Sequence, residues 1–122
     1  MAKDLTIRLG ADEPGAVSKV AEALAAAGIN LEGFAEVEGL VHVLLAEADV
    51  ERAAGALERA GLEVAYEHDV VVVPVDDEPG GLARLTRQIA EAGVNLRFVY
   101  LATGTRVVFA AHDPAALRRV LS

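Results

Sequence analysis

The sequence contains no cysteine and no tryptophan, and aromatic residues make up only 4% of its 122 positions. The lack of cysteine excludes disulfide bonds, thiol catalysis and cysteine-ligated metal sites. A core with so few aromatics has to be built from the aliphatic side chains that dominate a 53% hydrophobic composition. No apolar run approaches the roughly 18 residues of a membrane-spanning helix, and the N-terminus lacks the apolar segment of a signal peptide. We therefore expect a cytoplasmic protein.

Positive charge is also scarce. The chain has 11 Lys or Arg against 19 Asp or Glu, which gives a net charge of −8. This balance disfavours binding to a nucleic-acid backbone or to an anionic membrane. The charge is uneven as well, because residues 1–66 carry −7 and residues 67–122 carry −1. We expect the two halves to share a fold and to differ in role.

One motif occurs twice along the chain. Asp-Glu-Pro-Gly stands at 12–15 and again at 77–80, and Gly-Ile-Asn-Leu at 28–31 is matched at the same spacing by Gly-Val-Asn-Leu at 93–96. Over residues 4–46 and 69–111, 13 of 43 positions are identical, mostly in the expected loops. Proline is pre-shaped for the first turn of a helix. The duplication predicts two units, residues 1–67 and residues 68–122.

The apolar spacing predicts the same elements in both units. Period-2 alternation indicates strands, and spacing at i, i+3, i+4 and i+7 indicates helices. The first unit reads as strands at 5–9, 30–37, 41–45 and 62–66 with helices at 14–27 and 49–60. The second reads as strands at 70–75, 94–102 and 105–111 with helices at 79–92 and 114–121. The order βαββαβ, then βαββα, predicts an α+β fold of two ferredoxin-like units, the second without its last strand. Each sheet is antiparallel with its helices on one face.

The other face of each sheet is expected to be open. In the first unit it carries Thr6, Arg8, His42 and Leu44. In the second unit the same positions of the repeat are Val71, Val73, Val107 and Phe109. An aliphatic face and an unpaired edge at 70–73 favour burial. We therefore expect them to be covered, either by the first unit of the same chain or by a second copy of the chain in a homodimer.

The twin signature Asp-Glu-Pro-Gly-(Ala/Gly)-(Val/Leu)…Ala-Gly-(Ile/Val)-Asn-Leu resembles the ACT domain over essentially the whole chain. ACT domains are regulatory modules that bind small molecules, most often amino acids, and are usually fused to metabolic enzymes. The resemblance implies a stand-alone tandem regulator, with effectors held where the strand–helix loop of one unit meets the second strand of its neighbour. By position it implies the ligand-binding residues Asp12, Gly15, Ala16, Asn30, Asp77, Gly80, Gly81 and Asn95. Some members have histidine two residues before the loop acid, where this chain has Gly10 and Val75.

The chemistry of these residue types suits an amino acid. A helix N-terminus presents unpaired N–H groups and partial positive charge, which favour an α-carboxylate. A nearby aspartate favours an α-ammonium, and an asparagine amide can donate to one group and accept from the other. The same residues have plainer interpretations: the aspartates can stabilise the turn, the glycines can be purely conformational, and the asparagines can be turn residues. Gly80-Gly81 suggests that the second loop is the roomier one.

Two functions remain open. The first is a non-catalytic regulator whose bound amino acid or similar zwitterion is relayed to a partner enzyme or to the oligomeric state. The alternative is a ligand-free protein–protein interaction module, such as a regulatory subunit of a metabolic enzyme. We expect no catalytic residues and no cofactor, because no Ser/His/Asp set shares a plausible pocket. The three histidines lack metal-ligand spacing, so no metal site is expected. Glu32, Glu36 and Glu38 are interpreted as a solvated strand face.

Overall fold

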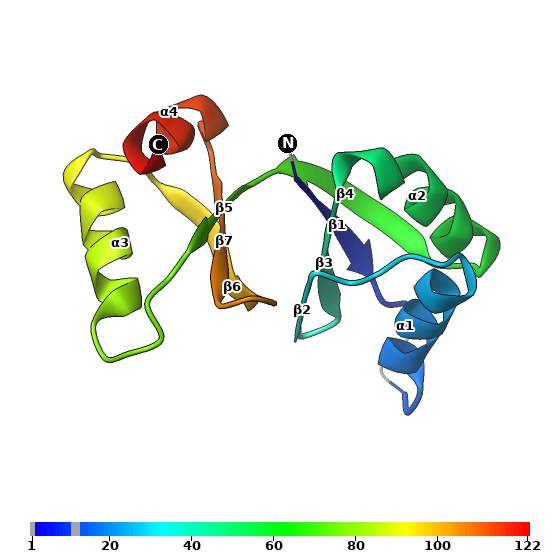
Figure 1. The fold of residues 1–122 in the computed structure, drawn as a ribbon. Helices are drawn as coiled ribbons and strands as arrows, with labels where there is room; N and C mark the ends of the chain where they lie inside the picture. Colours follow the sequence, from blue (N-terminus) through cyan, green and yellow to red (C-terminus); the bar gives the residue numbers. More distant parts are fainter. Residues whose placement is uncertain (1, 11–12) are drawn as a thin grey trace. The chain divides into compact units, whose positions relative to one another are not determined.

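The computed structural model describes residues 2–10 and 13–122, so the predicted site residue Asp12 lies outside the described residues. The chain divides into two compact units, residues 1–68 and residues 69–122. Figure 1 shows the helices and strands of both units. The assignment of separate domains to residues 1–67 and 68–122 stays a prediction.

The first unit has the predicted βαββαβ order. Its elements are β1 (Lys3–Arg8), α1 (Ala16–Ala26), β2 (Gly33–Val37), β3 (Leu40–Leu45), the short 3-10 helix η1 (Glu47–Asp49), α2 (Val50–Arg59) and β4 (Glu63–Asp69). The sheet order is β4-β1-β3-β2, with β3 antiparallel to both β1 and β2. Both helices cover one face (Figure 1), and their buried residues join alternate strand residues in one aliphatic core: Leu5, Ile7, Val20, Leu24, Val41, Val43, Leu45, Ala53 and Leu57.

The second unit has the predicted βαββα order. It contains β5 (Val71–Pro74), α3 (Gly81–Glu91), β6 (Leu96–Ala102), β7 (Arg106–Ala111) and α4 (Pro114–Leu121). The order β6-β7-β5 leaves β5 at the edge, as the missing last strand predicts. Helix α4 begins with Pro114 at its first position, and the Asp113 carboxylate accepts a hydrogen bond from the Ala116 N–H at 3.1 Å. The α+β fold of two ferredoxin-like units is therefore confirmed.

The predicted open face is correct for the first unit and wrong for the second. In the first unit, Thr6 and His42 alternate with core residues and lie on the face away from the helices. In the second unit, Val107 and Phe109 are core residues, and Val71 and Val73 pack against that core together with Leu85 and Ile89 of α3. The face away from the helices carries Val72, Val108 and Ala110 instead.

Two one-residue differences in the repeat explain this error. The loop between β5 and α3 is one residue shorter than the loop between β1 and α1, which shifts β5 against the motif, and the turn before β7 is one residue longer. The turn between β2 and β3 has two residues, because Val37 pairs with Leu40. The turn between β6 and β7 has three, because Ala102 pairs with Arg106. One extra turn residue shifts every later side chain of β7 to the opposite face. The helices of the two units thus keep the spacing of the duplicated motif, whereas β7 begins one position later than that spacing predicts.

On the open face of the first unit, side-chain hydrogen bonds to Tyr66 and then to Glu63 raise the pKa of Arg8 above its ordinary value. The Arg8 guanidinium therefore keeps its charge.

Within residues 2–10 and 13–122, none of the helices of either unit is long and apolar enough to cross a membrane.

Candidate functional site

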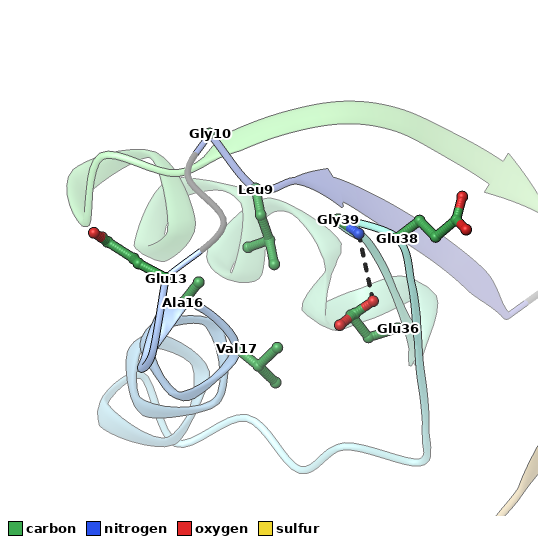
Figure 2. Close-up of a pocket in the computed structure, with 8 residues that line it drawn as sticks. All are labelled: Leu9, Gly10, Glu13, Ala16, Val17, Glu36, Glu38 and Gly39. Carbon is green, nitrogen blue, oxygen red and sulfur yellow. Dashed lines mark hydrogen bonds between the residues drawn. The ribbon is translucent and has the colours of Figure 1, made fainter.

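A pocket of about 590 Å³ lies in the first unit between the start of α1 and the turn that joins β2 to β3. Figure 2 shows it in close-up. Three segments line it: the end of β1 with its following loop, the first turn of α1, and the β2–β3 hairpin. The lining residues are Leu9, Gly10, Glu13, Ala16, Val17, Glu36, Glu38 and Gly39.

Local backbone geometry brings these segments together. The Leu9 N–H donates to the Gly39 carbonyl at 2.8 Å, which ties the end of β1 to the hairpin turn. Gly15 caps α1 with φ of 92°, a left-handed conformation that glycine adopts without strain. This cap turns the chain sharply into the helix, and the Lys19 N–H then donates to the Gly15 carbonyl at 3.0 Å. The first N–H groups of α1 consequently border the pocket.

The pocket is acidic. Glu36 extends from β2 towards the middle of the pocket, opposite Val17, and its carboxylate accepts a long hydrogen bond of 3.4 Å from the Gly39 N–H (Figure 2). Glu13 and Glu38 lie at the two ends, with carboxylates that point outwards (Figure 2). None of the described residues that line the pocket is Lys, Arg or His. Among the described lining residues, the Glu36 carboxylate is therefore met only by the Gly39 N–H.

The second unit has a pocket of about 480 Å³ in the same position of the fold. The Val75 N–H donates to the Thr105 carbonyl at 3.1 Å, as Leu9 does to Gly39. The walls differ in chemistry, because Leu101 occupies the strand position of Glu36: Leu101 pairs with Val107 as Glu36 pairs with Val41. The lining residues are Val75, Asp76, Asp77, Glu78, Pro79, Gly80, Leu82, Ala83, Leu101, Ala102, Thr105 and Arg106.

The loop of the second unit is one residue shorter than that of the first, whereas we expected it to be the roomier one. It has four residues between Val75 and the helix-capping Gly80, whereas the first unit has five between Leu9 and Gly15. The shorter loop brings the chain onto the helix start, so a Cβ at Gly81 would clash with the backbone carbonyl oxygen of Asp76. Gly81 is buried and therefore serves close packing.

An ion pair also fixes this second loop. The Arg84 guanidinium lies 2.8 Å from an Asp76 carboxylate oxygen and 3.7 Å from a Glu78 oxygen. In the first unit Ala11 precedes Asp12 as Asp76 precedes Asp77, so the shorter of these two contacts has no counterpart there.

Replacing Arg84 by glutamine is expected to have a small effect on stability. The side chains of the pair are more than half exposed, so removing it should lower the free energy of unfolding by less than about 1 kcal/mol. Urea unfolding followed by circular dichroism measures this, with Arg87→Gln one helical turn away as the matched control. A loss of more than about 2 kcal/mol exceeds what an exposed ion pair contributes, and it would show that the loop depends on Arg84 for its fold.

The structure brings some of the predicted site residues together. Ala16 lines the first pocket, Gly15 caps the helix beside it, and Asp77 and Gly80 line the second pocket. Gly81 lies buried at the start of α3. Asn30 and Asn95 are exposed and follow the C-terminal ends of α1 and α3. An 11-residue helix of about 16 Å therefore separates each asparagine from the loop of its own unit. Their predicted meeting with the loop of a neighbouring unit stays a prediction.

The hairpin wall is the part of the pocket that sequence reasoning missed. Glu36 and Glu38 were interpreted as a solvated strand face, and Leu101 was assigned no role. The signal was present in the topology. Because β1 and β2 flank β3 and both run antiparallel to it, the C-terminal end of β1 and the β2–β3 turn lie at the same end of the strands.

Among the described residues, no group of three or more His, Cys, Asp or Glu is placed to hold a metal ion.

Comparison with solved structures shows the same fold over 98% of the chain. A crystal structure of a Bacteroides thetaiotaomicron protein is 27% identical, with a TM-score of 0.77 and 85% of that chain covered. The structure of the aspartokinase alpha and beta subunits is 19% identical, with a TM-score of 0.76 and 85% covered. The regulatory subunit of aspartate kinase from Thermus flavus is 20% identical, with a TM-score of 0.69 and 90% covered. The two aspartate kinase structures are too distant in sequence to establish more than the fold.

The sequence also matches a family model. No curated protein matches the chain, whereas residues 5–59 match the model of the ACT domain. These residues run from β1 to the end of α2, and the second unit repeats the same order from β5 to α4. The first unit thus matches the ACT domain, and the second unit repeats its order of elements, as the duplicated motif predicts.

Proposed function

We propose that this protein is a non-catalytic regulator that binds a small amino acid, or a similar zwitterionic metabolite, in the loop–helix–hairpin pocket of its ACT units. One observation carries the proposal: each unit has its own pocket, with a helix N-terminus and a carboxylate-bearing loop at the rim. The same arrangement is kept although the two loops differ in length.

Each end of an amino acid has a partner of the right sign at this rim. The first N–H of each helix donates to the carbonyl of Glu13 or Glu78 in the preceding loop. The N–H groups that follow it in the first turn of α1 or α3 receive the α-carboxylate. Loop carboxylates receive the α-ammonium, with Asp77 lining the second pocket and Glu13 the first. Asp12 is the corresponding loop acid in the sequence of the first unit. Both pockets are open and their carboxylates exposed, which favours reversible binding over tight retention.

The comparisons support a regulatory role with an enzyme partner. Structures that align with 98% of this chain include the regulatory subunits of aspartate kinase from Thermus flavus and Thermus thermophilus. We therefore propose a metabolic enzyme as the partner, with the ligand shifting either that contact or the oligomeric state, in the simplest case a homodimer. The cytoplasm is the compartment in which such a partner would be met.

Thermal-shift screening of the full chain against the twenty amino acids tests ligand binding. A ligand at ten times its Kd should stabilise the folded protein by about 1.4 kcal/mol, because it binds the folded state alone. Ala16→Leu, which fills the first pocket, should abolish the response of that unit. Ser18→Leu adds the same side chain two residues along the helix, outside the pocket lining, and should keep the response.

The alternative of an interaction module gives the opposite result. It predicts no stabilisation by any amino acid at millimolar concentration, together with a stoichiometric protein partner in a pull-down. It also predicts that Ala16→Leu and Ser18→Leu behave alike. A ligand response that Ser18→Leu retains and Ala16→Leu loses would therefore exclude it.

A further inference from the structure

The two pockets occupy the same place in their units, yet one wall position differs in charge. Glu36 of β2 and Leu101 of β6 both lie on the helix-facing side of their sheets, one pair before the hairpin turn. In the first pocket a carboxylate therefore faces the start of the helix, and in the second pocket an isobutyl group does. This wall lies across the pocket from the helix, where the side chain of a ligand held at the helix start would extend.

From this pair we infer that Glu36 and Leu101 determine the specificity of the two pockets, so that the units bind different classes of amino acid. The inference rests on the proposed function. The first pocket takes an amino acid with a cationic side chain, whose charge pairs with the Glu36 carboxylate. The second takes an amino acid with an aliphatic side chain, which packs on Leu101.

Charge supports the assignment of the first pocket. Glu36 accepts one long backbone hydrogen bond, and the described lining residues include no basic side chain. Glu13 and Glu38 at the two ends add negative potential of the same sign. An apolar ligand side chain would offer these carboxylates no hydrogen-bond donor. A ligand ammonium or guanidinium would gain a charge-assisted hydrogen bond there.

Exposed apolar surface supports the assignment of the second pocket. Leu101 is 63% exposed and Leu82 of α3 is 40% exposed, and both line the pocket. Both join Val75 in an apolar wall that an aliphatic side chain would remove from water. Val17 of the first unit stands at the helix position of Leu82, so the two helix walls are alike. The strand walls differ in Glu36 against Leu101, and Arg106 adds a cationic side chain to the second pocket alone among the described lining residues.

Calorimetric titration with lysine and norleucine tests the inference, because the two ligands differ mainly in the terminal ammonium. The unmodified protein should bind lysine in one unit and norleucine in the other, each with a stoichiometry of one. Raising the salt from about 0.05 to about 0.5 M should weaken lysine binding and leave norleucine binding nearly unchanged.

Substitutions at two exposed positions assign the ligands to the units. Glu36→Gln should weaken lysine binding about tenfold and leave norleucine unaffected, since the charge pair is lost and the shape kept. Leu101→Glu should abolish norleucine binding and leave the first lysine site unaffected. If both ligands bind and neither substitution changes their affinities, the specificity inference fails and the proposed function stands. If no amino acid binds the unmodified protein, the proposed function itself fails.

Discussion

Gly81→Ala should lower the free energy of unfolding by about 3 kcal/mol or more, the upper end of the usual range for overpacking. A Cβ at this position would clash with the Asp76 carbonyl oxygen and would lie 3.2 Å from the Asp76 Cβ. Neither group is the flexible end of a side chain, so relief requires the loop or the start of α3 to move. Urea unfolding of the full chain, followed by circular dichroism, measures the loss.

Gly10→Ala is the matched control. A Cβ at Gly10 would meet nothing within 4 Å, so this substitution should change stability by less than about 0.5 kcal/mol. A rescue separates close packing from a general loss of helix stability. One glycine inserted between Val75 and Asp76 gives the second loop the length of the first, and it should restore most of the stability of Gly81→Ala. If the insertion restores nothing, the short loop is not the cause.

The length of this loop also marks how far the sequence could predict the structure. The Asp-Glu-Pro-Gly motif, the strand and helix periods and the order of the elements predicted both units correctly. The identical motif, however, suggested one constant spacing between the two units. The spacing instead grows by one residue between the helices and β7, and only the hydrogen-bonded register reveals the change.

Two features of the second unit hid this offset. Residues 70–73 are four consecutive valines, so they contain no alternation that could assign a face. The match of Val43 with Val108 at the spacing of the motif was misleading as well, because Val43 is a core residue and Val108 lies on the opposite face. A two-residue shift would have kept the face, whereas a one-residue shift reverses it.

The candidate pocket was predicted on one side only. Loop and helix residues carry a recognisable motif, which is why the sequence suggested Ala16, Asp77 and Gly80, and these residues line the two pockets. Their role in binding stays a prediction. The facing wall comes from the hairpin later in each unit, and Glu36 and Leu101 share no residue type that repetition could reveal. Their common role follows from register, since each lies one pair before its turn.

Thr6→Val should lower the free energy of unfolding by about 2 kcal/mol, because it removes a donor from a fully buried carboxylate. The Thr6 hydroxyl donates to an Asp4 carboxylate oxygen at 2.7 Å, and the His42 Nδ1 lies 3.1 Å from the other oxygen. Asp4 is 0% exposed and Thr6 is 2% exposed, so water cannot replace the lost hydrogen bond. Valine keeps the shape of threonine, which limits any change in packing.

Thr6→Ser keeps the hydroxyl and serves as the control, with an expected loss of less than about 1 kcal/mol for the single missing methyl group. A double-mutant cycle then isolates the hydrogen bond from the packing. In an Asp4→Ala background the Thr6 hydroxyl keeps its 3.1 Å contact with the His42 Nδ1. Thr6→Val should then cost less than about 1 kcal/mol, and the coupling free energy should exceed about 1 kcal/mol. Equal costs in both backgrounds would mean that Thr6 acts through packing alone. A coupling free energy above about 1 kcal/mol would show that the Thr6 hydroxyl stabilises the first unit by hydrogen bonding to Asp4.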